Sequence, residues 1–158
     1  MKVFVAAPFG RYLGRDGEFD TRFRRHLEEF YARLTDAGLE YFSAQVNENW
    51  GASPLSPAEC VPIDYDELLS SDAVVALLGT PPSLGVAIEL GWASALGKPI
   101  IVVGTATDAS SMIAGLGRVA DVCLISRDLG DGPSATGQVL GQLVIDQILT
   151  KSTSAALD

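Results

Sequence analysis

The segment from residue 73 to residue 103 constrains the fold more than any other part of the chain. It begins with a short apolar run, AVVALLG, and continues through a small loop, TPPSLGV. The amphipathic pattern AIELGWASALG follows, and a second apolar run, KPIIVV, closes the segment. Apolar runs of this length are typical of strands buried on both faces, and the pattern between them fits one helix. The segment therefore predicts a buried strand, a turn, a helix and a second buried strand.

The start of this helix is a candidate anion site. Pro81 and Pro82 exclude regular structure before it, and Gly85 permits a sharp entry of the backbone, so we expect the helix to begin near residue 85. Its free N–H groups then point back into the loop, with the hydroxyl of Ser83 beside them. Helix starts of this kind bind anions, and a phosphate suits such a site.

Glu89 is the candidate for the centre of the chemistry. We expect it in about the first turn of the same helix, where the apolar pattern does not require an acid. A carboxylate close to a phosphate site suggests a sugar phosphate lying across the helix start, with the acid under its reactive carbon. The alternative is a solvated residue that complements the helix dipole.

Strand-like segments also occur at residues 2–7, 39–44 and 120–125, and helical patterns separate them. Five strands that alternate with helices predict a single α/β domain with a parallel sheet, right-handed crossovers and helices on both faces. We expect a flavodoxin-like (Rossmann-like) domain with strand order 2-1-3-4-5. The catalytic domain is expected to span residues 1–150, and residues 151–158 to fray.

In a sheet of this order, ligands bind where the strand order reverses, beyond the ends of strands one and three. Those ends are Pro8-Phe9 and residues 79–83. The two loops are thus expected to meet at the site, and the helix that carries Glu89 opens into it.

The first helix is expected after Asp20, which can cap it, and Gly38 ends it. Its basic run, residues 22–26, is expected on the solvated face, so the lone His26 is a poor candidate for catalysis. The apolar positions of this helix follow spacings of four, three and four: Phe23, Leu27, Phe30 and Leu34.

A further helix should begin at the sequence SPAE, residues 56–59, which forms a capping box with proline at the first helical position. Pro62 is expected to interrupt it, by a kink or a restart. Beyond Pro62, Asp64 shares one face with Leu68, whereas Asp66 points elsewhere. An acid on the apolar side of a helix is unusual, and the alternative to a functional role is a boundary carboxylate bonded to a neighbouring loop.

Composition excludes several classes of function. The chain has 158 residues, 47% of them hydrophobic, which suits one domain with a substantial core. Its formal charge of −9 would repel a nucleic acid polymer, although small anions can still bind locally. No apolar run approaches the roughly 20 residues that span a bilayer. The start, MKVFVAAPFG, is broken too early for a signal peptide, so we expect a cytoplasmic protein.

Motifs of other enzyme classes are missing from the sequence. Cys60 and Cys123 form neither a disulfide framework nor a zinc site, so no metal and no cofactor are expected. There is no Walker loop, no GxGxxG and no Gly-x-Ser-x-Gly elbow. A phosphoacceptor receiver domain needs acids at the ends of strands one and three, and this chain has Ala6-Ala7 and Leu78-Gly79 there.

Four pieces of sequence together carry a resemblance to a known family: VFVAAPF, WGASPLSPAE, IDYDELLSSDAVVALLG and PPSLGVAIELGWASALGKPIIVV. They resemble the nucleoside 2-deoxyribosyltransferase-like superfamily. Within it, the chain looks most similar to the nucleoside 5′-monophosphate N-glycosidases, particularly the cytidylate and hydroxymethylcytidylate hydrolases of nucleoside-antibiotic pathways. The resemblance covers about three-quarters of the chain.

The resemblance implies roles for the two acids. Glu89 matches the family nucleophile, which attacks C1′ of the sugar and displaces the base, and Asp64 matches the acid that orients or protonates the departing base. The implied reaction is cleavage of the N-glycosidic bond of a nucleoside 5′-monophosphate, CMP-type favoured, to free base and pentose 5-phosphate. Water rather than a second base then completes the reaction through a glycosyl-enzyme. A 2-deoxyribosyltransferase and a non-catalytic nucleotide-binding module are the alternatives.

The resemblance also implies a binding site shared between two subunits. Ser83 and Gly85 match the phosphate-binding helix start. Ser110, in the sequence SSMIAG with Met112, lies where relatives have a serine that reaches the phosphate of a neighbouring subunit, so a homodimer is implied. The alignment could instead place Ser111 there, and Ser110 could be only a helix cap.

Aromatic residues and one arginine complete the implied pocket. Phe4 and Phe9 would line the base and sugar, and Trp50 could add a stacking face. The alternatives are that Phe4 belongs to the core and that Trp50 only packs its own loop. Gly10 stands where close relatives have an arginine, with Arg11 next, and residues 45–49 carry no arginine. Both departures fall where a base or a phosphate would be held, so the base, the sugar and the need for phosphate stay open.

Overall fold

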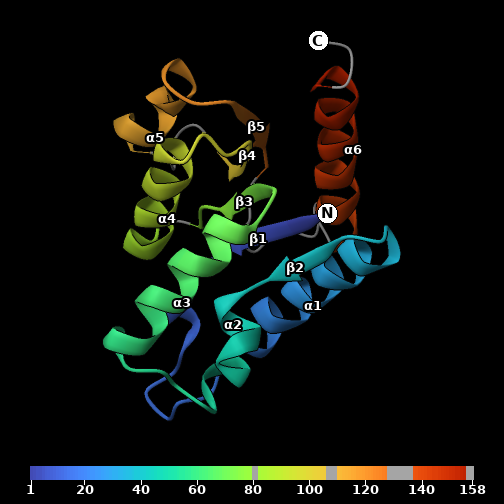
Figure 1. The fold of residues 1–158 in the computed structure, drawn as a ribbon. Helices are drawn as coiled ribbons and strands as arrows, with labels where there is room; N and C mark the ends of the chain where they lie inside the picture. Colours follow the sequence, from blue (N-terminus) through green and yellow to red (C-terminus); the bar gives the residue numbers. More distant parts are fainter. Residues whose placement is uncertain (80–81, 106–109, 128–136, 156–158) are drawn as a thin grey trace.

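The computed structural model describes residues 1–79, 82–105, 110–127 and 137–155, with side chains up to residue 150. Its centre is one parallel five-stranded sheet with the order β2-β1-β3-β4-β5 (Figure 1). The strands are β1 (Lys2–Ala6), β2 (Glu40–Phe42), β3 (Ala73–Leu77), β4 (Ile100–Gly104) and β5 (Val122–Ser126). The fold class and the strand order expected from the sequence are confirmed.

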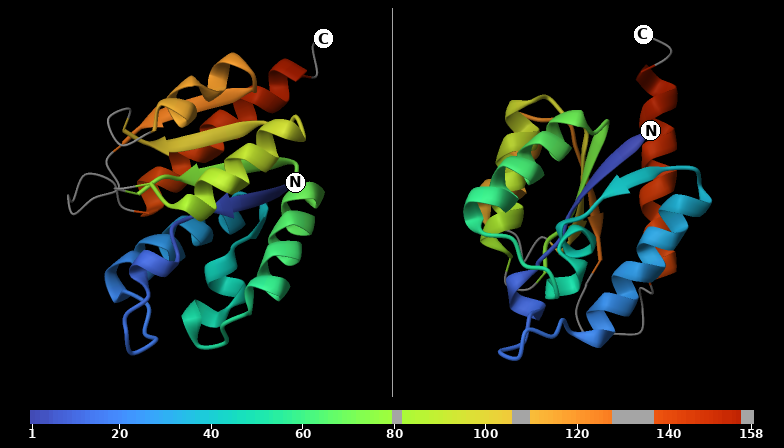
Figure 2. Two further views of the ribbon diagram at one scale, coloured as in Figure 1. Left: turned by 90° about the vertical axis from the view of Figure 1, so that its left-hand side faces the viewer. Right: turned by 60° about the horizontal axis from the view of Figure 1, so that its bottom comes forward.

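Helices cover both faces of the sheet. The principal helices are α1 (Thr21–Asp36), α3 (Pro57–Ser70), α4 (Leu84–Ala95) and α6 (Gly137–Ala155). Figure 1 shows α1 and α6 on one face and α3, α4 and α5 (Ser111–Gly115) on the other, and Figure 2 shows the same layers from two further directions. The short helical turns are α2 (Ala44–Asn47), η1 (Gly10–Tyr12), η2 (Asn49–Gly51) and η3 (Leu116–Arg118).

Two apolar clusters fill the spaces between the sheet and its helices, because successive strand side chains point to opposite faces. On β1, Val3 and Val5 join the cluster under α1 and α6, whereas Phe4 and Ala6 join the cluster under α3 and α4. Every residue of β3 and β4 is buried. Each large aliphatic side chain buried in this way stabilises the fold by about 1.5–3 kcal/mol relative to exposure.

Local capping interactions fix the ends of α1 and α3 as the sequence predicts. The Oδ1 atom of Asp20 accepts a hydrogen bond from the Phe23 N–H at 2.7 Å. At the other end of α1, Gly38 has φ +76°, a conformation that glycine adopts without strain. The capping box of α3 is present, with the Ser56 N–H donating to Glu59 at 2.9 Å.

Two local expectations, at Pro62 and at His26, differ from the structure. The helix α3 continues through Pro62 rather than restarting there, at the loss of one backbone hydrogen bond. The segment after β2 forms the short turns α2 and η2. His26 is half-buried beside the start of α6 rather than fully solvated, and its Nε2 is shielded without a hydrogen-bond partner among the described residues. The last helix, α6, extends to Ala155.

Parts of the expected loops, at residues 80–81, 106–109 and 128–136, lie outside the described residues. Among the residues that the structure does describe, we find no helix with the length and apolar character needed to cross a bilayer.

Candidate active site

Glu89 lies in the second turn of α4, one turn deeper than the sequence suggested, because α4 begins at Leu84 with Ser83 as its N-cap. Its carboxylate oxygen Oε2 is sealed from solvent and has no hydrogen-bond partner among the described residues. Burial, with the negative charge of Asp64 as the second cause, raises the pKa of Glu89 to about 8. A buried acid without a partner, with a pKa shifted this far, is typical of a functional group.

Asp64 approaches Glu89 from the neighbouring helix, α3. The two helices pack side by side, and the Tyr65 ring meets the Trp92 ring edge-on at 5.4 Å between centroids. Asp64 is partly buried on the same side of α3 as the buried Leu68. Burial, and then the charge of Glu48, raises the pKa of Asp64 to about 6.

Glu48 is a third acid in this group, and sequence reasoning missed it. It follows α2 directly and is only 7% exposed. Its Oε2 accepts a hydrogen bond from the Leu55 N–H at 3.0 Å. No motif singles it out, because Glu48 stands among polar residues and meets Asp64 only through the tertiary fold. The only signal for Glu48 in the sequence is its position. It stands just before the WG pair, in the segment that leads to the SPAE capping box.

The arrangement of the three acids supports proton transfer and nucleophilic attack. Coupled carboxyl groups do not all ionise at neutral pH, so the pair Asp64 and Glu89 can hold a proton between them. One member can then act as a nucleophile while the other donates or accepts a proton. Within the described residues, no group of histidine, cysteine and acidic side chains has an arrangement that could hold a metal ion.

The start of α4 lies one turn before Glu89 in the same helix. The first N–H groups of a helix have no acceptor inside the helix, and Ser83 makes no capping hydrogen bond with its side chain. A methyl group placed on Gly85 would lie 3.6 Å from the Ser83 hydroxyl, so the two residues face the same space. Thr80 and Pro81 of the preceding loop lie outside the described residues.

The aromatic residues considered for the site lie apart from one another in the fold. Phe4 is 1% exposed and stacks on Phe42 at 5.5 Å, so it is a core residue. Phe9 lies just beyond the end of β1, partly buried, with its ring 5.7 Å from that of Phe19. Arg11 is exposed on η1.

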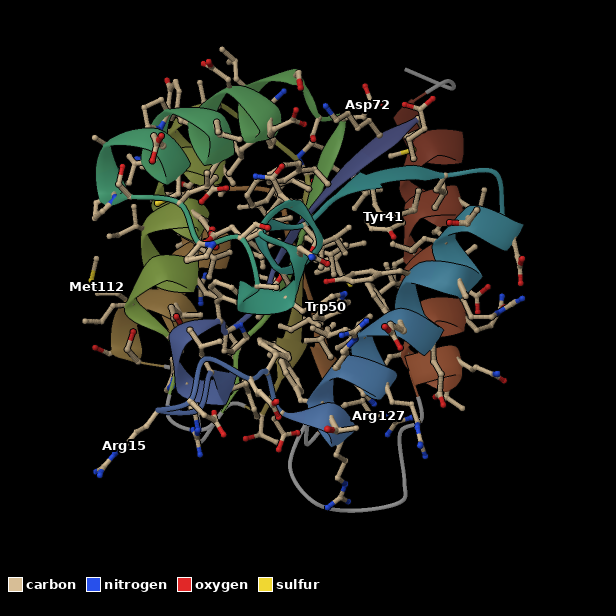
Figure 3. All side chains as sticks on the ribbon, turned by 90° about the horizontal axis from the view of Figure 1, so that it is seen from below. Arg15, Tyr41, Trp50, Asp72, Met112 and Arg127 are labelled. Carbon is tan, nitrogen blue, oxygen red and sulfur yellow. The ribbon has the colours of Figure 1, made fainter. Side chains whose placement is uncertain are left out.

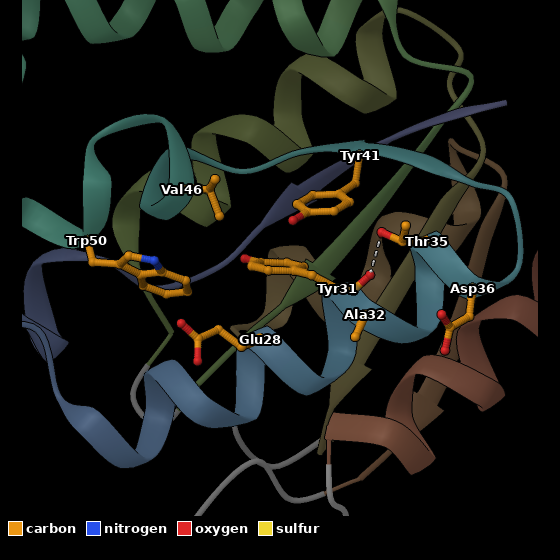
Figure 4. Close-up of a pocket in the computed structure, with 8 residues that line it drawn as sticks. All are labelled: Glu28, Tyr31, Ala32, Thr35, Asp36, Tyr41, Val46 and Trp50. Atoms are coloured by element: carbon orange, nitrogen blue, oxygen red, sulfur yellow. Dashed lines mark hydrogen bonds between the residues drawn. The ribbon is translucent and has the colours of Figure 1, made fainter.

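Trp50 packs on the α1 side of the sheet. Its backbone has φ +58°, which is uncommon for a bulky residue. The Phe19 ring meets its ring at 5.3 Å, and the guanidinium of Arg24 lies 4.9 Å from the ring centre. The indole also lines a surface cavity of about 470 Å³, shown in Figure 4, which includes neither Asp64 nor Glu89. Trp50 therefore packs its own loop against α1.

Beneath this cavity, a chain of buried hydrogen bonds leads to the end of β1. The Tyr31 hydroxyl bonds to Ser43 at 2.7 Å, and the Ser43 hydroxyl donates to the Gln45 side chain at 2.7 Å. The Gln45 amide donates to the Ala7 carbonyl at 2.8 Å. Because each member is satisfied, the chain fixes the backbone that leads into Pro8.

Ser110 and Met112 lie at the start of α5. The Ser110 hydroxyl accepts a hydrogen bond from the Ile113 N–H at 3.3 Å. Ser110 therefore caps α5, which is the alternative that the sequence left open to a role in phosphate binding. Met112 is 81% exposed and projects away from the molecule (Figure 3).

The family model described as nucleoside 2-deoxyribosyltransferase matches residues 12–132. The chain belongs to this family. Within the match lie both Asp64 and Glu89, together with Ser83 and the whole of α3 and α4.

Two solved structures are similar to this member of the family over most of its length. One is the CMP N-glycosidase BcmB from Clostridium botulinum, with 27% identity, 92% of this chain and 98% of that chain covered, and a TM-score of 0.66. The other is the solution structure of BlsM, with 32% identity, 93% of each chain covered and a TM-score of 0.71. No curated protein matches the chain. The family and the glycosidase neighbour identify a protein that processes nucleosides or nucleotides.

Proposed function

We propose that this protein hydrolyses the N-glycosidic bond of a nucleoside 5′-monophosphate, with CMP favoured, to free base and pentose 5-phosphate. The observation that carries the proposal is the pair of the buried Glu89 and the partly buried Asp64, with Glu89 one turn from the start of α4. The similarity to a protein named CMP N-glycosidase supports the choice of reaction.

In the proposed reaction, the carboxylate of Glu89 attacks C1′ of the sugar, and the bond from C1′ to the base nitrogen breaks. The base leaves with the bonding electron pair and takes a proton from Asp64. Water then attacks C1′, the ester to Glu89 breaks, and the proton from water returns to Asp64. Two carboxyl groups perform the same steps in retaining glycosidases. The developing positive charge on the sugar stabilises the ionised form of Glu89, which burial disfavours in the empty site.

The phosphate is proposed to bind at the start of α4, on the backbone N–H groups and the Ser83 hydroxyl. Binding energy from the phosphate would hold C1′ over Glu89, so nucleosides without phosphate should react poorly. Phe9 and Arg11, on the loop after β1, are proposed to contact the base or the sugar. The carboxylates of Asp64 and Glu89 would repel a second anionic group. The proposed site therefore suits a ligand whose negative charge lies only at its phosphate end.

A homodimer is proposed because α3 and α4 carry unusually exposed apolar stripes. The stripe on α3 contains Val61, Tyr65 and Leu69, at intervals of four residues, and the stripe on α4 contains Leu84 and Ile88. Contact between Tyr65 and Trp92 joins them into one surface. An exposed apolar surface of this kind marks an interaction site, and Ser110 and Met112 would reach the partner's site from its edge.

The deciding experiment is a chromatographic assay for free base with ribo- and deoxyribonucleoside monophosphates and their unphosphorylated counterparts. Wild type is compared with Glu89→Gln and Asp64→Asn, and Asp66→Asn serves as the matched control because Asp66 is exposed on the same helix. We expect release from monophosphates alone, abolished by Glu89→Gln and retained by Asp66→Asn.

A 2-deoxyribosyltransferase is the second candidate, which the description of the matching family favours. It would exchange bases on unphosphorylated deoxynucleosides and would release base only when a second free base is supplied. That outcome would replace the hydrolase proposal. Binding without turnover in either assay would instead support a non-catalytic nucleotide-binding module.

A further inference from the structure

The side chain of Gln45 is buried, although it is polar and belongs to α2, a helix of only four residues. It is 1% exposed, and Ser43, two residues before it, is 2% exposed. A buried amide costs free energy unless its donor and acceptor groups form hydrogen bonds. An apolar residue would fill the same space without that requirement, so the hydrogen bonds of Gln45 show what the residue does.

The amide of Gln45 is the middle of a chain of hydrogen bonds. Its Nε2 donates to the Ala7 carbonyl at 2.8 Å, and the Pro8 carbonyl oxygen lies 3.5 Å from it. Carbonyl oxygens only accept, so they fix the orientation of the amide. Its Oε1 accepts from Ser43 at 2.7 Å, and because that hydroxyl has one proton, Tyr31 is the donor in the 2.7 Å bond to Ser43. The chain therefore runs from α1 through Gln45 to the backbone after β1.

Gln45 takes the place of a strand partner at the end of β1. The ladder between β1 and β2 ends at Phe4 of β1, and the ladder between β1 and β3 ends at Ala6. Ala7 and Pro8 follow beyond both ladders, and the Gln45 amide faces their carbonyl groups. Gln45 thus holds the backbone at the point where it leaves the sheet.

The end of β1 borders the proposed site. The strand order reverses between β1 and β3, and ligands of such sheets bind beyond the carboxyl ends of these two strands. Ala6 belongs to the same buried cluster as Val86 and Leu90, which stand on either side of Glu89 in α4. The loop that carries Phe9 therefore starts beside the helix of the proposed nucleophile.

The segment that contains Gln45 also holds the far part of this loop. A methyl group on Gly51, in η2, would collide with the side chain of Leu13. The Trp50 ring meets the Phe19 ring at 5.3 Å between centroids. The turns α2 and η2 together therefore hold the loop between β1 and α1 at both ends, and Gln45 holds the end nearer to the site.

We propose that Gln45 is a positioning residue, which holds the loop after β1 where Phe9 and Arg11 bind the substrate. This inference rests on the proposed function. Gln45 acts through the backbone at Ala7 and Pro8 rather than on the substrate itself. A displacement of about 1 Å in groups that position a substrate lowers reaction rates by up to roughly 100-fold, so the loss of this contact should be measurable.

The test compares the steady-state kinetics of CMP hydrolysis in wild type, Gln45→Met and Asn47→Leu. Methionine keeps the length of glutamine but cannot donate to the Ala7 carbonyl. Asn47→Leu makes the same kind of change, from an amide to an apolar side chain, at an exposed position of α2. We expect Gln45→Met to raise KM by about 10-fold or more with a smaller change in kcat, and Asn47→Leu to match wild type.

A purely structural role has a different signature. Partial unfolding removes active enzyme, so it lowers kcat and leaves KM unchanged. That result for Gln45→Met, or kinetics equal to those of wild type, would overturn the inference, while the proposed hydrolysis would stand. Thermal melting establishes that Gln45→Met is folded at the assay temperature. If it is not, Ser43→Ala replaces it, since this variant keeps Gln45 and removes the hydroxyl that orients it, and a smaller rise in KM is expected.

A second measurement separates this inference from the proposed reaction, because it requires no turnover. Calorimetry compares the binding of CMP to Glu89→Gln with its binding to the same variant carrying Gln45→Met. Binding weaker by about 10-fold or more in the double variant supports the inference even if wild type releases no base at all. Equal affinity of the two variants, or no binding of CMP to either, counts against it.

Discussion

Asp64 on α3 and Glu89 on α4 lie close enough that the charge of the first, added to burial, raises the pKa of the second to about 8. Ordinary glutamate has a value of 4.5. The relationship couples the protonation of two acids on different helices, and four predictions follow from it and from the surrounding fold.

The stability of the protein should depend on pH through Glu89. Because its folded-state pKa is raised, its contribution to stability is full below pH 4.5 and is lost as the pH rises through about 8. Glu89→Gln keeps the shape without the charge, so we expect it to melt at a higher temperature than wild type at pH 9, with little difference at pH 5. At about 1.4 kcal/mol per pKa unit, the free-energy gain at pH 9 is at most a few kcal/mol. Equal melting temperatures at pH 9 would show that the ionised carboxylate is well solvated in the folded state.

Base release should have a maximum in kcat/KM between about pH 6 and pH 8, the values towards which Asp64 and Glu89 are shifted. Asp64→Asn removes both a proton donor and a negative charge beside Glu89. We expect activity lower by about 10²–10⁴-fold and a profile that rises with pH to a plateau, with its midpoint below 8. The pH-rate profile of Asp66→Asn should match that of wild type. If kcat/KM of Asp64→Asn still falls at high pH as it does in wild type, a group other than Asp64 causes that fall.

The apolar stripes of α3 and α4 should hold two copies of the chain together. Ile88 is 55% exposed on α4, so Ile88→Glu places a charge in the proposed interface, where burying it costs several kcal/mol. Sedimentation equilibrium should show a dimer for wild type and a monomer for this variant. Leu149→Glu is the control, because Leu149 is 58% exposed on α6, on the opposite face of the sheet. A monomeric wild type at high concentration would rule the dimer out.

A glycine at the start of α6 should be required for its packing on α1. A methyl group on Gly137 would lie 2.0 Å from the His26 carbonyl oxygen and 2.8 Å from the Phe30 amide nitrogen. Gly137→Ala should therefore destabilise the fold by about 1–3 kcal/mol in urea unfolding. Gly91→Ala, on the exposed side of α4 with no atom within 4 Å, should be neutral or stabilise by up to about 1 kcal/mol. A Gly137→Ala variant as stable as wild type would mean that the two helices separate at little cost.

The sequence led to Asp64 and Glu89 because each is an acid where the helical apolar pattern does not require one, and because the surrounding motifs resemble a family. It misplaced details that depend on packing. Pro62 lies inside a continuous helix, where it costs one backbone hydrogen bond and does not end the helix. Trp50, for which the sequence left open a stacking face or packing of its own loop, lies against α1, where the backbone turns after Glu48.

The sequence by itself determined the order of the elements and the parallel sheet, because burial on both faces and amphipathic periods are local properties of the chain. It also supplied the caps at Asp20 and Ser56. Only the tertiary structure decided that Glu48 lies near Asp64 and that Asp64 lies near Glu89, since the three residues are distant in sequence and α3 packs against α4. Their pKa shifts have the same origin, because desolvation and charge depend on distance in space, which no local pattern encodes.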